Sequence, residues 1–296
     1  MDALRHAVLK MAAWTARRLP SKVRTALYRL GPATGLIRGA LNQAAPQGRT
    51  KVEIAAGLLQ GSHFELDLQE EKDLWLGNYE TALQAWLPSW IQSGMVVYDV
   101  GANIGYLTVA FAQLVGPKGS VYAFEPLPEN QIRLEQAVAD NNLEERIRVI
   151  EAAVGAGGQR ARFLVHASGG MGKLAGSYGR DTAYASQIEV EVCTLDDYVL
   201  GGQAPAPDWV KVDVEGGEGA VLQGANQLLK EVRPSWLVEI HGPEAGKQTL
   251  QLLQEADYRL WTIGQQLRSV LDPDHLDWKA YLLALPEERA ENILHG

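Results

Sequence analysis

The feature that most constrains this chain is a glycine-bounded turn after a short apolar run. Residues 96–105 read VVYDVGANIG, and a second apolar run, VYAFEP at 121–126, ends on an acid roughly 20 residues beyond the turn. A strand, a glycine turn, a helix and a second strand-end acid form the unit that binds nucleotide-type ligands in open parallel sheets. The pattern therefore predicts an α/β fold with a ligand site at the carboxyl ends of its strands.

The turn also indicates which ligand is bound. A dinucleotide fingerprint, G-x-G-x-x-G, has a middle glycine so that the backbone can approach a pyrophosphate. Here that position is Asn103, between Gly101 and Gly105. Its side chain crowds a pyrophosphate but suits S-adenosylmethionine, which has none, and the carboxylate of Glu125 can accept both ribose hydroxyls. We therefore favour S-adenosylmethionine over the alternative, a nicotinamide dinucleotide serving an oxidoreductase.

Charge is distributed unevenly along the 296 residues. Residues 1–50 hold nine Lys and Arg and one acid, a balance of +8, which leaves −17 for residues 51–296 because the whole chain carries −9. An acidic body argues against a nucleic-acid partner, which requires a basic face. Cys193 is the single cysteine, so no intramolecular disulfide is expected, and its alternating neighbours predict a strand residue rather than a nucleophile.

Residues 1–20 have a helical apolar pattern of Leu4, Val8, Met11 and Trp14 among basic residues. Two interpretations are open: a helix on an anionic membrane surface, or a helix packed against the main domain or a partner subunit. Charged residues interrupt any signal-peptide core, and no apolar run reaches the ~18 residues of a membrane span. We expect a cytoplasmic protein, with peripheral membrane contact only under the first interpretation.

Three regions are expected: a basic helical extension at 1–50, a hairpin and helix at 51–94, and the main domain at 95–290. Strands and helices alternate in the main domain, which predicts a mostly parallel sheet covered on both faces. The expected strands of the main domain are 95–100, 120–125, 146–151, 209–214, 235–240, 258–263 and 280–285, with the last two antiparallel at an edge. Its expected helices are 104–115, 128–141 and 220–230. The preceding region should contain a hairpin at 53–68 and a helix at 75–91. Short strands at 160–165 and 187–192 flank a loop that is either a substrate lid or a surface excursion.

Each of five predicted strands is followed by polar residues. The residues at the five strand ends are Asp99 and Gly101, Glu125 and Pro126, Glu151 and Ala152, the run from Asp213 to Glu218, and Glu239 to His241, so each end carries at least one polar residue. The carboxyl ends of parallel strands meet at one edge of a sheet, where open α/β folds bind their ligands. We therefore expect these residues to form one site.

Six sequence blocks now make a family resemblance specific. They are GNYE at 77–80, YDVGANIG at 98–105, FEP at 124–126, TLDD at 194–197, KVDVEG at 211–216 and VEIH at 238–241. The chain resembles the FkbM family of S-adenosylmethionine-dependent methyltransferases over roughly residues 60–285. The resemblance implies the seven-stranded class I methyltransferase sheet, S-adenosylmethionine as cofactor and, as in most characterised members, methyl transfer to oxygen.

Roles on the cofactor side follow from this chemistry. The backbone around Asp99, Gly101, Asn103 and Gly105 should hold the methionine portion, with Asp213 nearby. Glu125 and Pro126 should hold the ribose, and Ala152 should flank the adenine. Glu80 either reaches the methionine end or caps a helix.

On the acceptor side an alcohol needs a general base, because its pKa is high. His241 is the first candidate, with Asp213 and Glu239 as its catalytic partners, and the alternative is a strand-end histidine bonded to backbone.

The acids Asp213, Glu215, Glu218 and Glu239 allow two interpretations. They ligate Mg²⁺ together with a substrate diol, or they bind acceptor hydroxyls and the cofactor ammonium without metal, with Glu215 and Glu218 partly serving as first-turn helix acids. We expect no required metal. The expected acceptor is a small-molecule or sugar hydroxyl in a glycan, glycolipid or secondary metabolite; a non-catalytic cofactor-binding scaffold is the remaining rival.

Overall fold

The computed structural model describes residues 2–19, 39, 41–166, 171–178, 184–272, 276–277 and 279–295. The chain forms two compact units, one of residues 1–86 with 136–142 and the other of residues 87–135 with 143–296.

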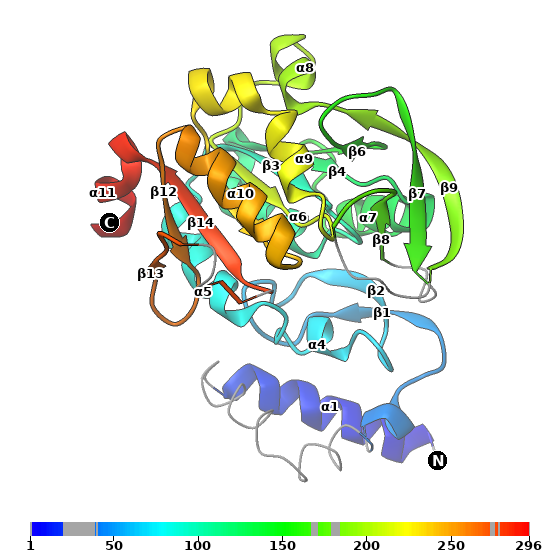
Figure 1. Cartoon of the computed structure of the whole chain (residues 1–296). Helices are drawn as coiled ribbons and strands as arrows, with labels where there is room; N and C mark the ends of the chain where they lie inside the picture. Colours follow the sequence, from blue (N-terminus) through cyan, green and yellow to red (C-terminus); the bar gives the residue numbers. More distant parts are fainter. Residues whose placement is uncertain are drawn as a thin grey trace. The chain divides into compact units, whose positions relative to one another are not determined.

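The first unit begins with helix α1 (Asp2–Arg18) and contains a hairpin of β1 (Arg49–Glu53) and β2 (His63–Asp67), as the sequence predicts (Figure 1). The helix expected at 75–91 is instead two helices, α4 (Lys72–Trp75) and α5 (Thr81–Trp90). The break lies at Gly77, whose φ is +69° and where a Cβ would stand 1.9 Å from the carbonyl oxygen of Ala56. A helix cannot continue through that left-handed conformation.

Helix α1 confirms the expected helix near the N-terminus. Two of its apolar residues face solvent, since Met11 is 63% and Trp14 55% exposed, and the guanidinium of Arg18 lies 4.3 Å from the Trp14 ring centroid. No helix among the described residues is long and apolar enough to cross a membrane. Membrane contact through residues 1–20 stays a prediction.

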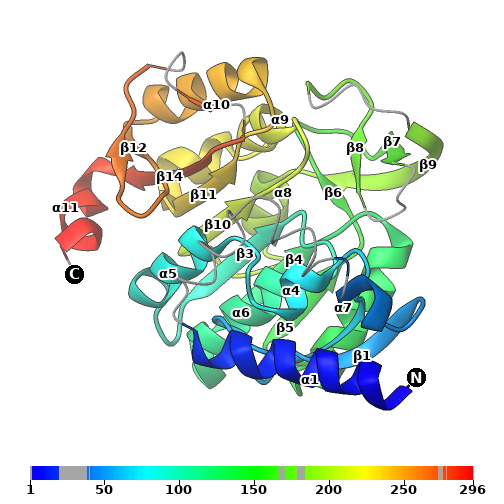
Figure 2. The same cartoon turned by 90° about the horizontal axis from the view of Figure 1, so that it is seen from below.

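The second unit is built on a mixed sheet with strand order β13-β12-β14-β11-β10-β3-β4-β5 (Figures 1 and 2). The strands are β3 (Val96–Val100), β4 (Ser120–Phe124), β5 (Ile147–Ile150), β10 (Trp209–Val212), β11 (Ser235–Glu239), β12 (Tyr258–Thr262), β13 (Arg268–Ser269) and β14 (Tyr281–Pro286). From β5 to β11 neighbouring strands are parallel, while β14 is antiparallel to both β11 and β12. The seven expected strands are confirmed, and the two-residue β13 adds an edge strand that the sequence did not indicate.

Helices cover both faces of this sheet, with α9 and α10 together on one side and α6 on the other (Figure 2). The helical segments are α6 (Tyr106–Val115), η1 (Gly116–Lys118), α7 (Pro128–Asp140), α8 (Leu195–Leu200), α9 (Glu218–Gln223), η2 (Leu228–Val232), α10 (Pro243–Glu255) and α11 (Glu287–His295). The single helix expected at 220–230 is interrupted at Gly224, whose carbonyl oxygen accepts the N–H of Asp196 at 2.9 Å. The Asp196 carboxylate in turn accepts the N–H groups of Gln227 and Leu228, each at 2.8 Å, where the next helical segment begins. Tyr98, Phe124 and Trp236 are among the largest fully buried side chains of the core on which the site rests.

A second, smaller sheet follows β5, with the order β6-β9-β7-β8. Its strands are β6 (Ala153–Val154), β7 (Arg160–His166), β8 (Gly172–Leu174) and β9 (Tyr184–Cys193). The two expected short strands are therefore confirmed as β7 and part of β9, paired antiparallel. The loop between them, expected to be a substrate lid or a surface excursion, lies partly outside the described residues. Within its described part, the backbone N–H of Tyr178 donates to the carbonyl oxygen of Gly216 at 3.1 Å. Cys193 is a strand residue, and burial raises the pKa of its thiol to about 11, which keeps it protonated.

Candidate functional site

The turn between β3 and α6 is built from residues in the left-handed region. Gly101, Asn103 and Gly105 have φ values of +74°, +52° and +86°. A Cβ at Gly101 would lie 1.9 Å from the carbonyl oxygen of Asp213, and one at Gly105 would lie 2.4 Å from Leu134 Cδ1. Both glycines are thus required by backbone conformation and by space.

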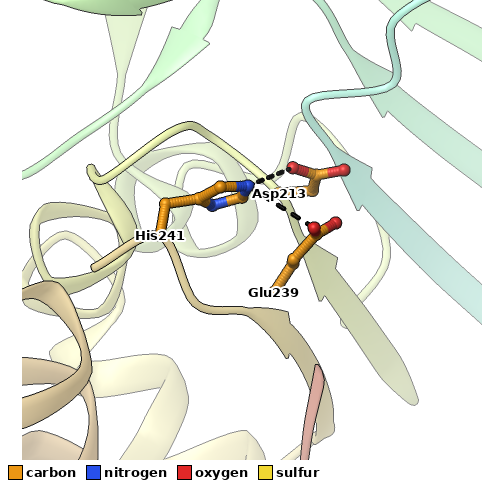
Figure 3. Close-up of side chains that lie close together, drawn as sticks. All are labelled: Asp213, Glu239 and His241. Carbon is orange, nitrogen blue, oxygen red and sulfur yellow. Dashed lines mark ion pairs between the residues drawn. The ribbon is translucent and has the colours of Figure 1, made fainter. Parts of the chain in front are cut away.

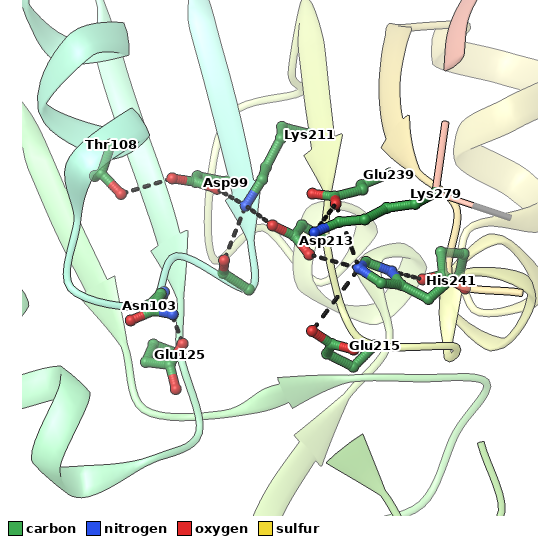
Figure 4. Close-up of polar contacts among 12 residues, drawn as sticks. Asp99, Asn103, Thr108, Glu125, Lys211, Asp213, Glu215, Glu239, His241 and Lys279 are labelled. Carbon is green, nitrogen blue, oxygen red and sulfur yellow. Dashed lines mark hydrogen bonds and ion pairs between the residues drawn. The ribbon is translucent and has the colours of Figure 1, made fainter. Parts of the chain in front are cut away.

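Glu125, at the end of β4, is oriented by the same turn (Figure 4). One carboxylate oxygen accepts the N–H of Asn103 at 2.8 Å, and the other accepts the N–H of Leu127 at 3.0 Å. Burial raises the pKa of Glu125, although these hydrogen bonds oppose the shift. A carboxylate oxygen can accept more than one hydrogen bond, so Glu125 keeps capacity for a pair of ligand hydroxyls.

Two further predicted residues lie beside Glu125. Pro126 is half-buried and follows it directly, and Ala152 is buried just beyond β5, the strand next to β4. The backbone N–H of Glu125 donates to the carbonyl oxygen of Ile150 at 3.1 Å, which holds the two strand ends together.

Lys211 contacts both Asp99 and the glycine turn, and sequence reasoning gave it no role. Strand register pairs Lys211 of β10 with Asp99 of β3, and its Nζ lies 3.0 Å from Asp99 Oδ1 while donating to the Gly101 carbonyl at 2.8 Å. Thr108 donates its hydroxyl to Asp99 Oδ2 at 2.6 Å. Burial lowers the pKa of Lys211, but Asp99 and Asp213 raise it more, so the lysine is charged.

The position of Lys211 carried a signal that sequence reasoning could have used. A lysine inside an apolar strand is almost never buried without a partner. Asp99 is itself 0% exposed and is linked to the turn through Lys211. Direct contact between Asp99 and the cofactor stays a prediction.

His241 is the centre of a second group of side chains, at the ends of β10 and β11 (Figures 3 and 4). Its Nδ1 lies 2.7 Å from Glu218 Oε1, which also accepts the N–H of Gly216 at 3.0 Å. Its Nε2 lies 3.6 Å from Asp213 Oδ1, 3.6 Å from Glu239 Oε1 and 3.8 Å from Glu215 Oε1. The sequence placed Glu218 in the acid cluster and partly among the first-turn helix acids, and the structure adds its contact with His241.

These carboxylates set the charge of His241. Burial lowers its pKa, but the hydrogen bond to Glu218 and the charges of Asp213, Glu218 and Glu215 outweigh burial and raise the pKa to about 9. With no other group bound, the imidazole is therefore protonated at neutral pH. The alternative of a histidine bonded to backbone finds no support among the described hydrogen bonds, where its ring bonds Glu218.

The structure thus brings most predicted residues to one edge of the sheet (Figure 4). Asp99, Gly101, Asn103, Gly105 and Glu125 are called the cofactor side, after the role that the sequence predicts for them. Asp213, Glu239 and His241 are called the acceptor side in the same way. Glu80 belongs to the first unit, that of residues 1–86 with 136–142. Its φ is +42°, and its carbonyl oxygen accepts the N–H of Gln84 at 2.9 Å. A role for Glu80 in cofactor binding stays a prediction.

Residues 99–260, more than half of the chain, match the family described as the methyltransferase FkbM domain. The chain belongs to the FkbM methyltransferase family. The matched segment begins at Asp99 and includes Glu125, Asp213, Glu239 and His241, so the site lies within the FkbM domain. The resemblance inferred from the six sequence blocks is confirmed.

Two curated relatives and one solved structure illustrate the family. The hexuronic acid methyltransferase AglP of Haloferax volcanii is 31% identical over 161 residues, covering 54% of this chain and 62% of the relative. The 31-O-demethyl-FK506 methyltransferase FkbM of Streptomyces tacrolimicus is 28% identical over 158 residues, covering 45% of this chain and 60% of the relative. This chain thus spans about three fifths of the length of these relatives.

The solved structure is the methyltransferase FkbM from Methylobacillus flagellatus KT. It aligns with a TM-score of 0.44 and 21% identity, over 64% of this chain and 43% of its own. That score is too low to carry an argument about function.

Proposed function

We propose that this chain is an S-adenosylmethionine-dependent O-methyltransferase acting on a hydroxyl of a sugar or another small molecule. The observation that carries the proposal is the arrangement of two polar groups at one sheet edge: Glu125 oriented by the glycine turn, and His241 among carboxylates at the neighbouring strand ends. Membership of the FkbM family supports methyl transfer, and the two relatives, a hexuronic acid methyltransferase and a 31-O-demethyl-FK506 methyltransferase, support an oxygen-rich acceptor.

The cofactor side fits S-adenosylmethionine. Glu125 is a buried carboxylate held by two backbone N–H groups, which suits the two hydroxyls of a ribose. Gly101 and Gly105 allow the left-handed conformation of the turn and its close approach to Asp213 and Leu134. We assign the methionine portion to the backbone of this turn. Lys211 and Asp99 fix the turn from beneath. S-adenosylmethionine supplies an activated methyl group when bound.

The acceptor side provides hydrogen-bond acceptors for hydroxyls. Asp213 is 20% exposed, more than the other two catalytic candidates, His241 at 2% and Glu239 at 5%. We assign the acceptor's proton to the Asp213 carboxylate, because His241 already carries a proton at neutral pH. Methyl transfer forms the O–CH₃ bond, breaks the S–CH₃ bond and leaves the electron pair of the broken bond on sulfur. The main contribution of the protein is therefore to position the acceptor oxygen against the methyl group.

The test begins with cofactor binding by calorimetry, using S-adenosylmethionine, S-adenosylhomocysteine and NAD⁺. We expect the first two ligands to bind and NAD⁺ not to bind; tight NAD⁺ binding would instead favour the oxidoreductase. Methyl transfer from labelled S-adenosylmethionine is then measured with a panel of uronic acid and neutral sugar glycosides. We expect turnover with at least one acceptor, and a large loss of turnover in Asp213→Ala and His241→Ala.

Two outcomes would contradict this proposal at different points. Binding of S-adenosylmethionine without turnover across a broad acceptor panel would favour a cofactor-binding scaffold. Unchanged turnover in both alanine variants would refute the catalytic assignment while leaving the methyltransferase activity intact.

A further inference from the structure

The donor atoms of three side chains converge at the ends of β10 and β11. Asp213 and Glu239 each offer a carboxylate oxygen and His241 offers a ring nitrogen, and these atoms all lie within 4.8 Å of one another (Figure 3). Nε2 of His241 is 3.6 Å from Asp213 Oδ1 and from Glu239 Oε1. Both separations exceed hydrogen-bonding distance. Among the described residues, Nε2 therefore has ion-pair neighbours but no hydrogen bond.

The ring of His241 is fixed from its other nitrogen. Nδ1 lies 2.7 Å from Glu218 Oε1, Glu218 is 0% exposed, and the His241 side chain is 2% exposed. This contact assigns a proton to Nδ1 and points Nε2 at the two carboxylates (Figure 4). A histidine that ligates a metal is held in the same way, because a carboxylate on the far nitrogen sets its tautomer and ring orientation.

The spacing of the donor atoms suits a single small cation. Two ligands that each lie about 2.1 Å from one ion are ~3.0–3.4 Å apart, depending on the coordination geometry. The two observed separations of 3.6 Å must shorten by ~0.2–0.6 Å to reach that range. Lys211 Nζ lies 3.7 Å from Asp213 Oδ2, the carboxylate oxygen that does not face Nε2. Lys279 Nζ lies 3.8 Å from Glu239 Oε1, the same oxygen that faces Nε2, but the Lys279 side chain is 50% exposed and can move into solvent when a cation binds.

We propose that Asp213, Glu239 and His241 bind a divalent cation of the first transition row, for which Mn²⁺ is the probe. One imidazole with two carboxylates suits such a cation better than Mg²⁺, which prefers oxygen ligands alone. Three protein ligands leave coordination positions open. That these positions take acceptor oxygens rests on the proposed function, whereas cation binding itself does not. The cation replaces the expectation from sequence that no metal is required.

The experiment measures Mn²⁺ binding to the full chain after treatment with a chelator. Calorimetry gives the affinity, and the loss of the free Mn²⁺ signal in electron paramagnetic resonance gives the stoichiometry. We expect one Mn²⁺ per chain, tighter than Mg²⁺, and at least ~10-fold weaker binding in Asp213→Asn and in Glu239→Gln. Glu244→Gln is the matched control, because Glu244 is an exposed acid at the start of α10 outside the cluster, and its Mn²⁺ affinity should equal that of the wild type.

S-adenosylmethionine binding to every variant separates a lost cation site from a lost fold. Wild-type protein that binds S-adenosylmethionine but not Mn²⁺ overturns the cation site and leaves the proposed function standing. Equal Mn²⁺ affinity in Asp213→Asn, Glu239→Gln and Glu244→Gln overturns it too, because the ion then binds elsewhere. Mn²⁺ binding that depends on Asp213 and Glu239 without any S-adenosylmethionine binding supports the cation site and refutes the methyltransferase.

Discussion

The two sides of the site use similar side chains in opposite ways. On the cofactor side, Asp99, Thr108 and Lys211 are joined by contacts of 2.6–3.0 Å, and Lys211 also donates to the turn at 2.8 Å. On the acceptor side, Nε2 of His241 stands 3.6–3.8 Å from three carboxylates. The first group is joined by short contacts and fixes the backbone, whereas in the second group Nε2 makes no hydrogen bond among the described residues.

The difference follows from what each group must hold. A buried charge is tolerated only when it is paired and hydrogen-bonded, and Lys211 and Asp99 meet that requirement within the protein. On the acceptor side the carboxylates of Asp213 and Glu239 lie 3.6 Å from Nε2 of His241, which is beyond hydrogen-bonding distance. Four substitutions test this contrast.

Lys211→Met should have the largest effect. It leaves the Asp99 carboxylate buried with Thr108 as its remaining partner, and removing one member of a buried pair costs about 3–5 kcal/mol. Urea unfolding measures the loss. The double variant Asp99→Asn/Lys211→Met removes both charges and should recover part of the stability; a double variant no more stable than Lys211→Met would contradict the pairing.

Gly101→Ala should have the next largest effect. It perturbs both sides at once, because the new Cβ would lie 1.9 Å from the carbonyl oxygen of Asp213. A left-handed alanine costs ~1–2 kcal/mol, and the overlap adds ~1–3 kcal/mol. Gly176→Ala isolates the first contribution, since Gly176 has φ +95° with nothing within 4 Å. Thermal unfolding and S-adenosylmethionine binding should show a larger loss for Gly101→Ala; equal losses in the two variants would rule out the overlap.

Glu125→Gln should weaken S-adenosylmethionine binding with a smaller change in stability. Losing hydrogen bonds to a charged group costs about 1.5–3 kcal/mol, or roughly 10–100-fold in affinity. Glu129→Gln, an exposed acid in the first turn of α7, is the matched control. Calorimetry that finds the two variants equal in affinity would remove Glu125 from the ribose site.

The same residue gives a pH dependence. Burial raises the pKa of Glu125 above its usual value, so wild-type affinity should begin to fall at a higher pH than for an ordinary glutamate as the carboxylate is protonated. The free energy of unfolding changes in the opposite direction. A raised carboxyl pKa means that the charged form of Glu125 destabilises the fold, and this destabilisation disappears as the pH falls through the folded-state pKa. Glu125→Gln should lose this component of the pH dependence, which affinity and unfolding measured from pH 4 to 8 will detect.

Lys279→Met should have the smallest effect. Lys279 is half exposed and lies 3.8 Å from Glu239 Oε1, and exposed ion pairs contribute about 0.2–1 kcal/mol. Urea unfolding in low and high salt should show a small loss that salt reduces. A loss as large as that of Lys211→Met would contradict this contrast between the two sides.

Local patterns in the sequence were sufficient for much of the fold. Apolar runs bounded by turn residues located all seven long strands of the main sheet, and the glycines of 101–105 located the turn, because both signals depend on residues close in sequence. The breaks at Gly77 and Gly224 were missed, since each involves a contact with a distant segment: Gly77 lies against Ala56, and the carbonyl oxygen of Gly224 accepts the N–H of Asp196.

By itself, the sequence determined the α/β fold, the turn and its acid Glu125, the family, and the strand ends that carry polar residues. Only the tertiary structure decided how those residues pair. Lys211 meets Asp99 because the register of β10 on β3 places them side by side, and Glu218 meets His241 because α9 and the end of β11 converge. Such contacts depend on strand register and packing between segments far apart in the chain, which local periodicity does not encode.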